Sequence, residues 1–383
     1  MNKRILVMIV LLLTFLSGCL DMNEPERMLY VNGIGIDFKD GKYELYTQFV
    51  NFSNTAKSEQ PIDVEAVQAE IGHATGETMD EAIFELYHSV DQKIYWGLMT
   101  YIVVSEEVMV NRKLSPVIDA FIRFKETRYQ IWVYATKDSV QDVLLIRPVL
   151  NASLTLSKLS DPKNSFKQES FIEPVDFRRV IVGLNEPSHE VNIPLVSVEE
   201  NWQSLNGTIK APVLSGVGVV TPTSFKGFIS GDKALGIQWM SSKMKRGQVT
   251  FKLDGGNYFT MIIDHVEVKI KPIVQKGEVK FDIDVQLETS VSSIGGKITK
   301  AQIRKEIKKV IKNDIQATYQ EALEKDIDIY NFSNVLYRKN VKEWKKYHKD
   351  GELDLTEDSI RNLKVTITNL TSERKSYEET IKP

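Results

Sequence analysis

The N-terminal segment constrains this chain most, because it decides in which compartment the rest of the chain folds. Lys3 and Arg4 precede an apolar run over residues 5–15, and small residues follow before Cys19. A charged start, a short apolar core and small residues before a cut site are the marks of a secretory signal peptide. The apolar run is too short to cross a bilayer as a permanent helix. We therefore predict an exported chain with a signal peptide over residues 1–18.

The end of this segment, Leu16-Ser17-Gly18-Cys19, resembles the lipobox at which bacterial lipoproteins are diacylated on sulfur and cleaved. Cys19 is the only cysteine of the chain, so lipidation explains both its presence and its position. The alternative is an ordinary cleaved signal, which would leave an odd thiol. Two or more acyl chains anchor durably. We predict lipid attachment at Cys19, a tether over residues 19–27, and a protein held on the membrane without crossing it.

Charge and length narrow the class of protein further. The chain of 383 residues carries 49 basic and 52 acidic side chains, and removal of Lys3 and Arg4 with the signal leaves 47 against 52, a net charge of −5. This balance favours neither nucleic acid nor an anionic membrane surface as a partner. With Cys19 lipidated, the mature chain has no disulfide and no thiolate metal site. Its length suffices for two or more packed domains.

The first half alternates strand signals with helix signals. Residues 29–50 alternate in hydrophobicity around Asp40-Gly41, which is typical of a β-hairpin. Thr78 and Glu81 have the spacing of a capping box, and apolar residues at helical spacing follow them. Further strands and helices succeed each other closely, which indicates an α/β or α+β layer.

In the second half, residues 279–288 alternate strictly between apolar and polar side chains. This pattern predicts a strand in a sheet with one wet face. Asp282 and Asp284 lie side by side on the polar face, where they would suit a metal site or an acid pair. We interpret them as a solvated strand face, because the alternation alone accounts for both carboxylates.

A long helix is predicted to begin at Thr299 with Gln302 as its capping partner. Its apolar stripe consists of Ile303, Ile307, Val310, Ile311, Ile315, Tyr319, Ala322 and Leu323. A basic face lies between these positions and consists of Arg304, Lys305, Lys308, Lys309 and Lys312. This face would suit phospholipid or an acidic partner, and an ordinary solvated face is the simpler interpretation. The apolar stripe must pack on the sheet.

These patterns predict a multidomain α+β protein with mixed or antiparallel sheets packed with helices. Residues 183–212 contain prolines and Asn206-Gly207 with little periodicity, so we place the domain boundary there. The predicted N-terminal domain covers residues 28–200 and the predicted C-terminal domain covers residues 201–377. The long helix is expected to lie on an antiparallel sheet in the second domain.

The sequence gives little support to an enzymatic function, and we predict no catalytic, cofactor-binding or metal-binding residues. The five histidines are scattered without ligand spacing, at His73, His88, His189, His265 and His348. No serine lies in a Gly-x-Ser-x-Gly motif. Gly33 and Gly35 resemble the start of a dinucleotide loop, but no third glycine follows in register. We interpret both glycines as local features of a strand or turn.

Two other functions stay open at this point. A cell-wall hydrolase needs only a carboxylate pair, which leaves no sequence motif. A solute-binding lipoprotein would capture a nutrient for a transporter. Such proteins usually consist of two α/β lobes with parallel sheets and a hinge, and the hairpin-rich second half disfavours that architecture.

Short sequence words in a fixed order carry a resemblance to a known family. Gly-Ile-Asp at residues 35–37, Phe-Ile-Arg-Phe-Lys-Glu-Thr-Arg at residues 121–128, and Asp328-Ile-Tyr, Leu336-Tyr-Arg-Lys and Trp344 follow the lipobox. With it they resemble the Ger(x)C family of spore germination lipoproteins over essentially the whole mature chain. The resemblance implies the lipoprotein subunit of a nutrient germinant receptor, beside two polytopic subunits in the spore inner membrane. It also implies a multidomain α+β fold without a known catalytic centre.

The chain departs from the family pattern at three positions. Asn331 and Ser333 stand where the family tends to have glycines after the aspartate that matches Asp328, and Asn369 replaces a usual glycine in the last strand. Asparagine tolerates left-handed backbone far better than most residues. We therefore expect the turn to survive at Asn331, while the local loop geometry is open at Ser333.

Overall fold

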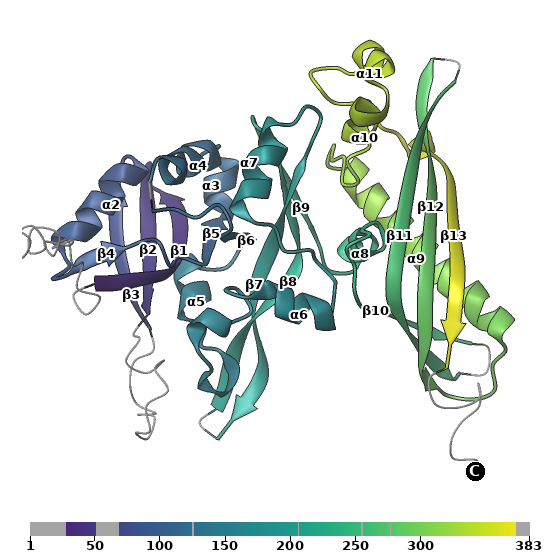
Figure 1. The fold of residues 1–383 in the computed structure, drawn as a ribbon, viewed down its shortest axis with the longest axis horizontal. Helices are drawn as coiled ribbons and strands as arrows, with labels where there is room; N and C mark the ends of the chain where they lie inside the picture. Colours follow the sequence, from purple (N-terminus) through teal and green to yellow (C-terminus); the bar gives the residue numbers. More distant parts are fainter. Residues whose placement is uncertain are drawn as a thin grey trace, which may run out of the picture.

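The computed structural model describes residues 28–50, 69–124, 126–205, 207–253, 256–275 and 277–372. The predicted signal peptide, the tether and Cys19 lie outside these residues. The described chain builds two sheets that follow one another along the long axis of an elongated molecule (Figure 1). Both sheets are packed with helices, which confirms the predicted α+β fold with mixed sheets.

The first sheet contains the strands β1 (Met28–Lys39), β2 (Lys42–Val50), β3 (Ala69–Gly76), β4 (Lys93–Tyr95), β5 (Tyr101–Ser105), β6 (Trp132–Thr136), β7 (Val191–Ser204), β8 (Gly207–Val220) and β9 (Phe225–Ser230). Its order is β3-β2-β1-β5-β6-β7-β8-β9, and β4 pairs with the beginning of β1. The central strands β1, β5, β6 and β7 are parallel. Antiparallel hairpins extend the sheet at both ends.

The predicted hairpin over residues 29–50 is confirmed as β1 and β2. Asp40 and Gly41 form the turn with φ angles of 51° and 82°. Both angles are left-handed, as a two-residue hairpin turn requires. Gly33 lies within β1, and a Cβ atom there would come within 2.3 Å of the Tyr101 ring. This glycine therefore serves close packing in the sheet.

Helices cover both faces of the first sheet. They are α2 (Met79–His88), α3 (Glu106–Val110), α4 (Leu114–Arg123), α5 (Val140–Leu145), α6 (Pro162–Gln168) and α7 (Phe177–Asn185). Apolar residues of α2, α3, α4 and α7 share one core cluster, whereas those of α5 lie in another. Thr78 caps α2 as predicted, since its hydroxyl accepts a hydrogen bond from the Glu81 amide at 3.1 Å. The Glu81 carboxylate binds the amide of Glu77, one residue before the cap.

The second half contains β10 (Gly247–Lys252), β11 (Tyr258–Gln275), β12 (Glu278–Ile294), β13 (Ile360–Thr371), α8 (Leu235–Trp239), α9 (Lys300–Leu323), α10 (Phe332–Lys339) and α11 (Val341–Tyr347). Short 3-10 turns occur in both halves: η3 (Val149–Asn151) and η4 (Leu154–Leu156) in the first, and η5 (Gly231–Ala234) and η6 (Glu357–Ser359) in the second. The strand order is β10-β11-β12-β13. The first three strands are antiparallel, but β13 pairs parallel to β12. The antiparallel sheet expected here is confirmed for these three strands, and β13 departs from it because α9 returns the chain along the sheet before β13 begins.

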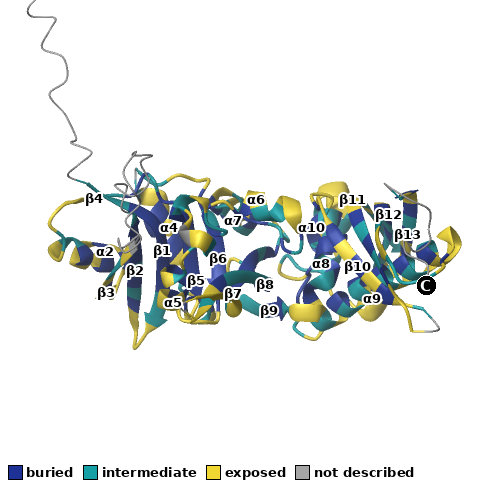
Figure 2. Ribbon diagram, turned by 90° about the horizontal axis from the view of Figure 1, so that it is seen from below, coloured by how far each residue is buried: buried dark blue, intermediate teal, exposed yellow. Residues whose placement is uncertain are grey.

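Helix α9 lies on the second sheet, as its apolar stripe predicts (Figure 1). Ile303, Ile307, Ile311 and Ile315 are completely buried. The predicted capping box is present at Thr299, whose hydroxyl accepts from the Gln302 amide while the Gln302 side chain accepts from the Thr299 amide. Figure 2 shows the buried residues along the strands of both sheets.

The two halves share apolar packing where the sheets approach one another. Val217, Val219 and Ile229 belong to β8 and β9 of the first sheet, yet they lie in the same core cluster as the residues of α9 and β12. Residues 200 and 201, between which the sequence places the domain boundary, both lie within β7. The first sheet continues beyond them to Ser230.

Candidate functional site at the junction of the two halves

A polar junction joins the loop between α7 and β7 to the chain around α10 and α11. We define it as residues 186–192 and Lys226 on one side and residues 326–352 on the other. These segments are a hundred residues or more apart in sequence, and their contacts are side-chain hydrogen bonds and ion pairs. The junction therefore forms only when both halves are folded.

Glu190 and Asp328 lie at the centre of the junction, and both are almost completely buried. The Asp328 amide donates to the Glu190 carboxylate at 3.0 Å, and the Glu190 amide donates to Oδ1 of Asn331 at 2.8 Å. Beside them, Nδ2 of Asn192 donates to the carbonyl oxygen of Ile329 at 3.2 Å. Side chains thus satisfy backbone groups from the opposite half, which buried backbone requires.

Asp328 also fixes the beginning of α10. Its two carboxylate oxygens accept hydrogen bonds from the amides of Phe332 and Ser333, at 2.8 and 2.7 Å. Free amides at a helix start need such acceptors. Burial raises the pKa of Asp328, and these two hydrogen bonds act against that shift. The aspartate that carries the family resemblance therefore accepts hydrogen bonds from the first two amides of α10, inside the junction.

The departures from the family pattern are accommodated here. Asn331 has φ 54° and ψ 42°, so it adopts the left-handed turn that was expected to survive. Ser333 lies within α10, and its hydroxyl accepts a hydrogen bond from the Leu353 amide at 3.1 Å. Asn369 is part of β13, where it pairs with Glu288. Of the three positions, only Asn331 has a left-handed backbone.

Lys226 brings positive charge to this acidic centre from β9. Its ammonium group lies 2.8 Å from Glu352, 3.1 Å from Asp326 and 3.8 Å from Glu190. Burial acts to lower the pKa of Lys226, but the hydrogen bonds to Glu352 and Asp326 outweigh it and the pKa is raised. Burial, followed by the charge of Asp328, raises the pKa of Glu190 to about 8. Glu190 is therefore mostly protonated at neutral pH, and Lys226 is charged.

The outer rim of the junction contains Arg338 and Trp344, two further residues of the motifs that carry the family resemblance. Arg338 forms two hydrogen bonds to the Glu186 carboxylate, at 2.8 and 2.5 Å. The indole nitrogen of Trp344 donates to the Ser188 hydroxyl at 2.7 Å, and that hydroxyl donates to the carbonyl of Gly351. The motif residues within 328–344 therefore join the two halves. The sequence patterns did not predict this role.

A cleft of about 390 Å³ opens beside the junction. Glu173 on its wall binds Arg179 at 2.5 Å and Lys243 at 2.7 Å, so the cleft joins side chains from both halves. His189 and Asn192 also line it, and one polar atom of each is buried without a hydrogen-bond partner. Burial lowers the pKa of His189.

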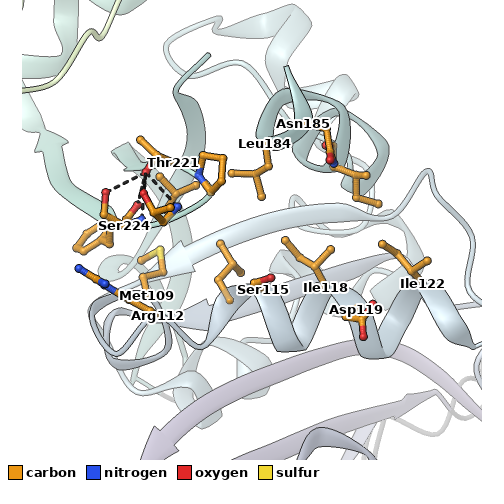
Figure 3. Close-up of a pocket in the computed structure, with 16 residues that line it drawn as sticks. Met109, Arg112, Ser115, Ile118, Asp119, Ile122, Leu184, Asn185, Thr221 and Ser224 are labelled. Carbon is orange, nitrogen blue, oxygen red and sulfur yellow. Dashed lines mark hydrogen bonds between the residues drawn. The ribbon is translucent and has the colours of Figure 1, made fainter. Parts of the chain in front are cut away.

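A second groove, of about 270 Å³, lies between α4, α7 and the turn that joins β8 to β9 (Figure 3). Ile118, Ile122 and Leu184 give it an apolar floor, and Thr221 closes the turn by accepting a hydrogen bond from the Ser224 amide at 3.1 Å. One wall of this groove is α4, and the C-terminal end of α4 overlaps the family motif at residues 121–128.

The remaining candidate residues do not come together. Oxygens of Asp282 pair with Arg361, whereas Asp284 accepts from Gln286 at 3.1 Å. The histidines occupy separate places: His73 stacks on Tyr46, His88 pairs with Glu85, His189 lines the cleft, His265 lies in β11, and His348 stacks on Trp344. The described residues contain no group of three side chains that would hold a metal ion. Within the same residues, no helix is long and apolar enough to cross a membrane.

Comparison with known proteins agrees with this architecture. Two family patterns match in succession: "Spore germination protein N-terminal domain" over residues 21–198, and "Spore germination B3/ GerAC like, C-terminal" over residues 215–369. The two-sheet α+β fold and the two family patterns together place this chain in a class of spore germination proteins. The chain belongs to the Ger(x)C family.

Individual relatives extend over most of the chain. Spore germination protein KC of Bacillus subtilis strain 168 is 22% identical over 379 residues, which covers 90% of each chain. Spore germination protein B3 of the same strain is 25% identical and covers 73% of this chain and 72% of its own. The crystal structure of the GerBC protein matches with a TM-score of 0.55 at 18% identity and covers 89% of this chain and 96% of the GerBC chain. That match supports the fold.

Proposed function

We propose that this protein is the lipid-anchored, non-enzymatic subunit of a spore nutrient germinant receptor. The observation that carries the proposal is the succession of both germination domains behind a lipobox sequence. The partners would be two polytopic receptor subunits in the spore inner membrane. The protein would lie on the outer face of that membrane, held by the lipid on Cys19.

The anchor would act by concentrating the folded domains near their partners. Residues 19–27 separate the lipidated cysteine from β1, and a chain of this length spans at most about 30 Å when extended. The folded chain would therefore stay in a thin layer above the membrane. A tether of this kind raises the effective concentration toward membrane partners without a large interface.

The junction supports a structural role for the second half. Glu190, Lys226 and Asp328 are engaged by other protein groups, so these buried polar side chains are used to join the two halves. The subunit would then present its two sheets to the receptor as one body. We also propose that the first structural unit ends after Ser230, where the first sheet ends, and that the second unit follows.

Spores that carry Cys19→Ala test the anchor and the receptor role together. Nutrient-triggered release of dipicolinate would be measured, with immunoblots of the membrane and soluble fractions. Slow germination together with loss of the protein from the membrane is the expected result. Asn23→Ala, a change within the predicted tether that leaves the lipobox intact, is the matched control. Normal germination by every nutrient, with the variant protein abundant and soluble, would contradict the proposal.

A separate assay tests the absence of enzymatic activity. The mature chain carrying Cys19→Ala would be incubated with purified spore peptidoglycan, and soluble fragments would be followed by chromatography. No release above that of a heat-denatured sample is expected. Turnover that depends on a folded protein would contradict the non-enzymatic assignment without affecting the anchor.

A further inference from the structure

A basic groove lies at the far edge of the second sheet, between α9 and β13. Its volume is about 610 Å³. Five lysines line it, four from the helix and one from the strand: Lys305, Lys308, Lys309, Lys312 and Lys364. Asn313, Gln316 and Asn362 add neutral polar groups, and none of the described residues that line the groove carries a carboxylate. The basic helix face noted in the sequence is therefore gathered against a strand.

These lysines are available for binding, in contrast to their neighbour Arg304. Arg304 donates a hydrogen bond to the carbonyl oxygen of Ile367 at 2.5 Å and so helps to hold α9 on β13. The five lysines form no ion pair or hydrogen bond with any described residue. The whole chain has more acidic than basic side chains, so the unpaired cluster is a local excess. An uncompensated positive groove attracts anionic groups.

The strand that forms one wall of the groove is an edge strand. Among the described strands β13 pairs with β12 alone, and Figure 1 shows α9 crossing the sheet and extending past β13. An edge strand presents backbone donors and acceptors along its outer side. An extended segment of another protein binds such an edge by adding a strand.

The spacing of the lysines suits an extended chain. Lys308 and Lys312 are four residues apart on a helix, which separates them by about 6 Å along its axis. Alternate side chains of a β-strand lie about 6.6 Å apart on one face. A strand with carboxylates at alternate positions would therefore bring one carboxylate to each of these lysines. Lys364 alternates with the buried residues Leu363 and Val365, so it lies on the other face of β13 and adds positive charge at the rim of the groove.

We propose that this groove binds an extended, acidic segment of a partner protein, which adds to the sheet beside β13. Backbone hydrogen bonds to the strand would give the segment its direction, and the lysines would select acidic side chains. A lipid headgroup would use the charges but not the strand edge, so the observations favour a peptide. The inference goes beyond the proposed receptor role and does not depend on the anchor.

Fluorescence anisotropy with synthetic peptides tests the groove on the mature chain carrying Cys19→Ala. The probe is a short, blocked peptide that alternates aspartate with valine. A second peptide has the same charge, with prolines that remove the backbone donors needed for pairing. The double variant Lys308→Glu/Lys312→Glu reverses the charge at two positions of the groove. The matched control, Lys39→Glu/Lys42→Glu, reverses the charge of two exposed lysines at the β1–β2 turn. Circular dichroism checks that each variant is folded.

We expect the alternating peptide to bind, the proline peptide to bind about tenfold more weakly, and the groove variant to lose about tenfold in affinity. The control variant should bind as the parent does. Equal binding of both peptides would overturn strand addition. No binding of either peptide would identify the lysines as a solvated face. Lysine-dependent binding to phosphatidylglycerol vesicles without peptide binding would replace the acidic peptide by a lipid surface.

Discussion

The junction and the basic groove use charge in opposite ways. At the junction, Lys226 is 12% exposed at its side chain and is surrounded by three carboxylates. In the groove, Lys308 and Lys312 are partly exposed, and neither has a carboxylate partner among the described residues. A buried charge must be paired to be tolerated, whereas an exposed charge costs little to leave unpaired. The junction is thus committed to holding the chain together, and the groove is free to meet a partner.

The largest expected effect is the loss of stability on replacing Asp328 of the junction, compared with replacing an aspartate on the surface. Asp328→Ala removes the acceptor of two buried amides, so we expect a loss of about 3 kcal/mol in the free energy of unfolding. Urea unfolding followed by tryptophan fluorescence measures it. Asp91→Ala, at an exposed position, should change the same quantity by less than about 0.5 kcal/mol. Similar values for both variants would mean that Asp328 does not carry the junction.

A pair of lysine substitutions compares the two regions directly. Lys226→Gln leaves Glu352 and Asp326 without their cation, and we expect a loss of about 2 kcal/mol in the free energy of unfolding. Lys312→Gln breaks no ion pair and should stay within about 0.5 kcal/mol of the parent. The same urea titration serves both variants. A large loss for Lys312→Gln would reveal a structural role and weaken the groove as a binding site.

The pH dependence of stability should reside in the junction. The pKa of Glu190 is about 8 in the folded chain and 4.5 ordinarily, so the folded state holds a proton that the unfolded state releases. Its contribution is full below pH 4.5 and is lost as the pH rises through 8. Between pH 6 and 8 we expect a fall of about 1 kcal/mol per pH unit. Thermal unfolding across this range measures it, and Glu190→Gln should flatten the slope. An unchanged slope in that variant would assign the dependence to another group.

The smallest expected effect lies at the rim of the junction. Arg338→Gln removes the pair with Glu186, but the arginine side chain is 60% exposed, and exposed pairs contribute little. We expect a loss of about 0.5 kcal/mol in the free energy of unfolding, which should shrink further in high salt. Urea unfolding at low and high salt checks this. A loss as large as that of Asp328→Ala would extend the core of the junction to its rim.

Local patterns predicted most of the elements because each depends on neighbours in sequence. The hairpin at Asp40-Gly41, the cap at Thr78 and the capping box at Thr299 were all found where the sequence indicates. The apolar stripe of α9 was also confirmed. The parallel pairing of β13 differs from the expected antiparallel sheet, since a strand's alternation is the same whichever way it runs beside its neighbour.

The predicted boundary near residue 200 depends on the same kind of local signal. Prolines and Asn206-Gly207 interrupt the hydrophobic pattern near residue 200 and suggest a linker. In the structure Pro194, Pro212 and Gly207 lie in strands of the β7–β8 hairpin of the first sheet. The two strands are antiparallel, and Ser204 pairs with Gly207 at their ends. Turn residues within a long hairpin give the same local signal as a linker between domains.

The sequence by itself determined the prediction of an exported, lipid-anchored α+β protein, the resemblance to its family, and the basic face of the long helix. These depend on short motifs and on periodicity, which local sequence carries. Only the tertiary structure decided that Asp328, Arg338 and Trp344 join the two halves, and that the lysines of α9 meet the edge of β13. Glu190 and Asp328 are 138 residues apart. Contacts between residues so far apart leave no local pattern, because packing of the whole chain brings them together.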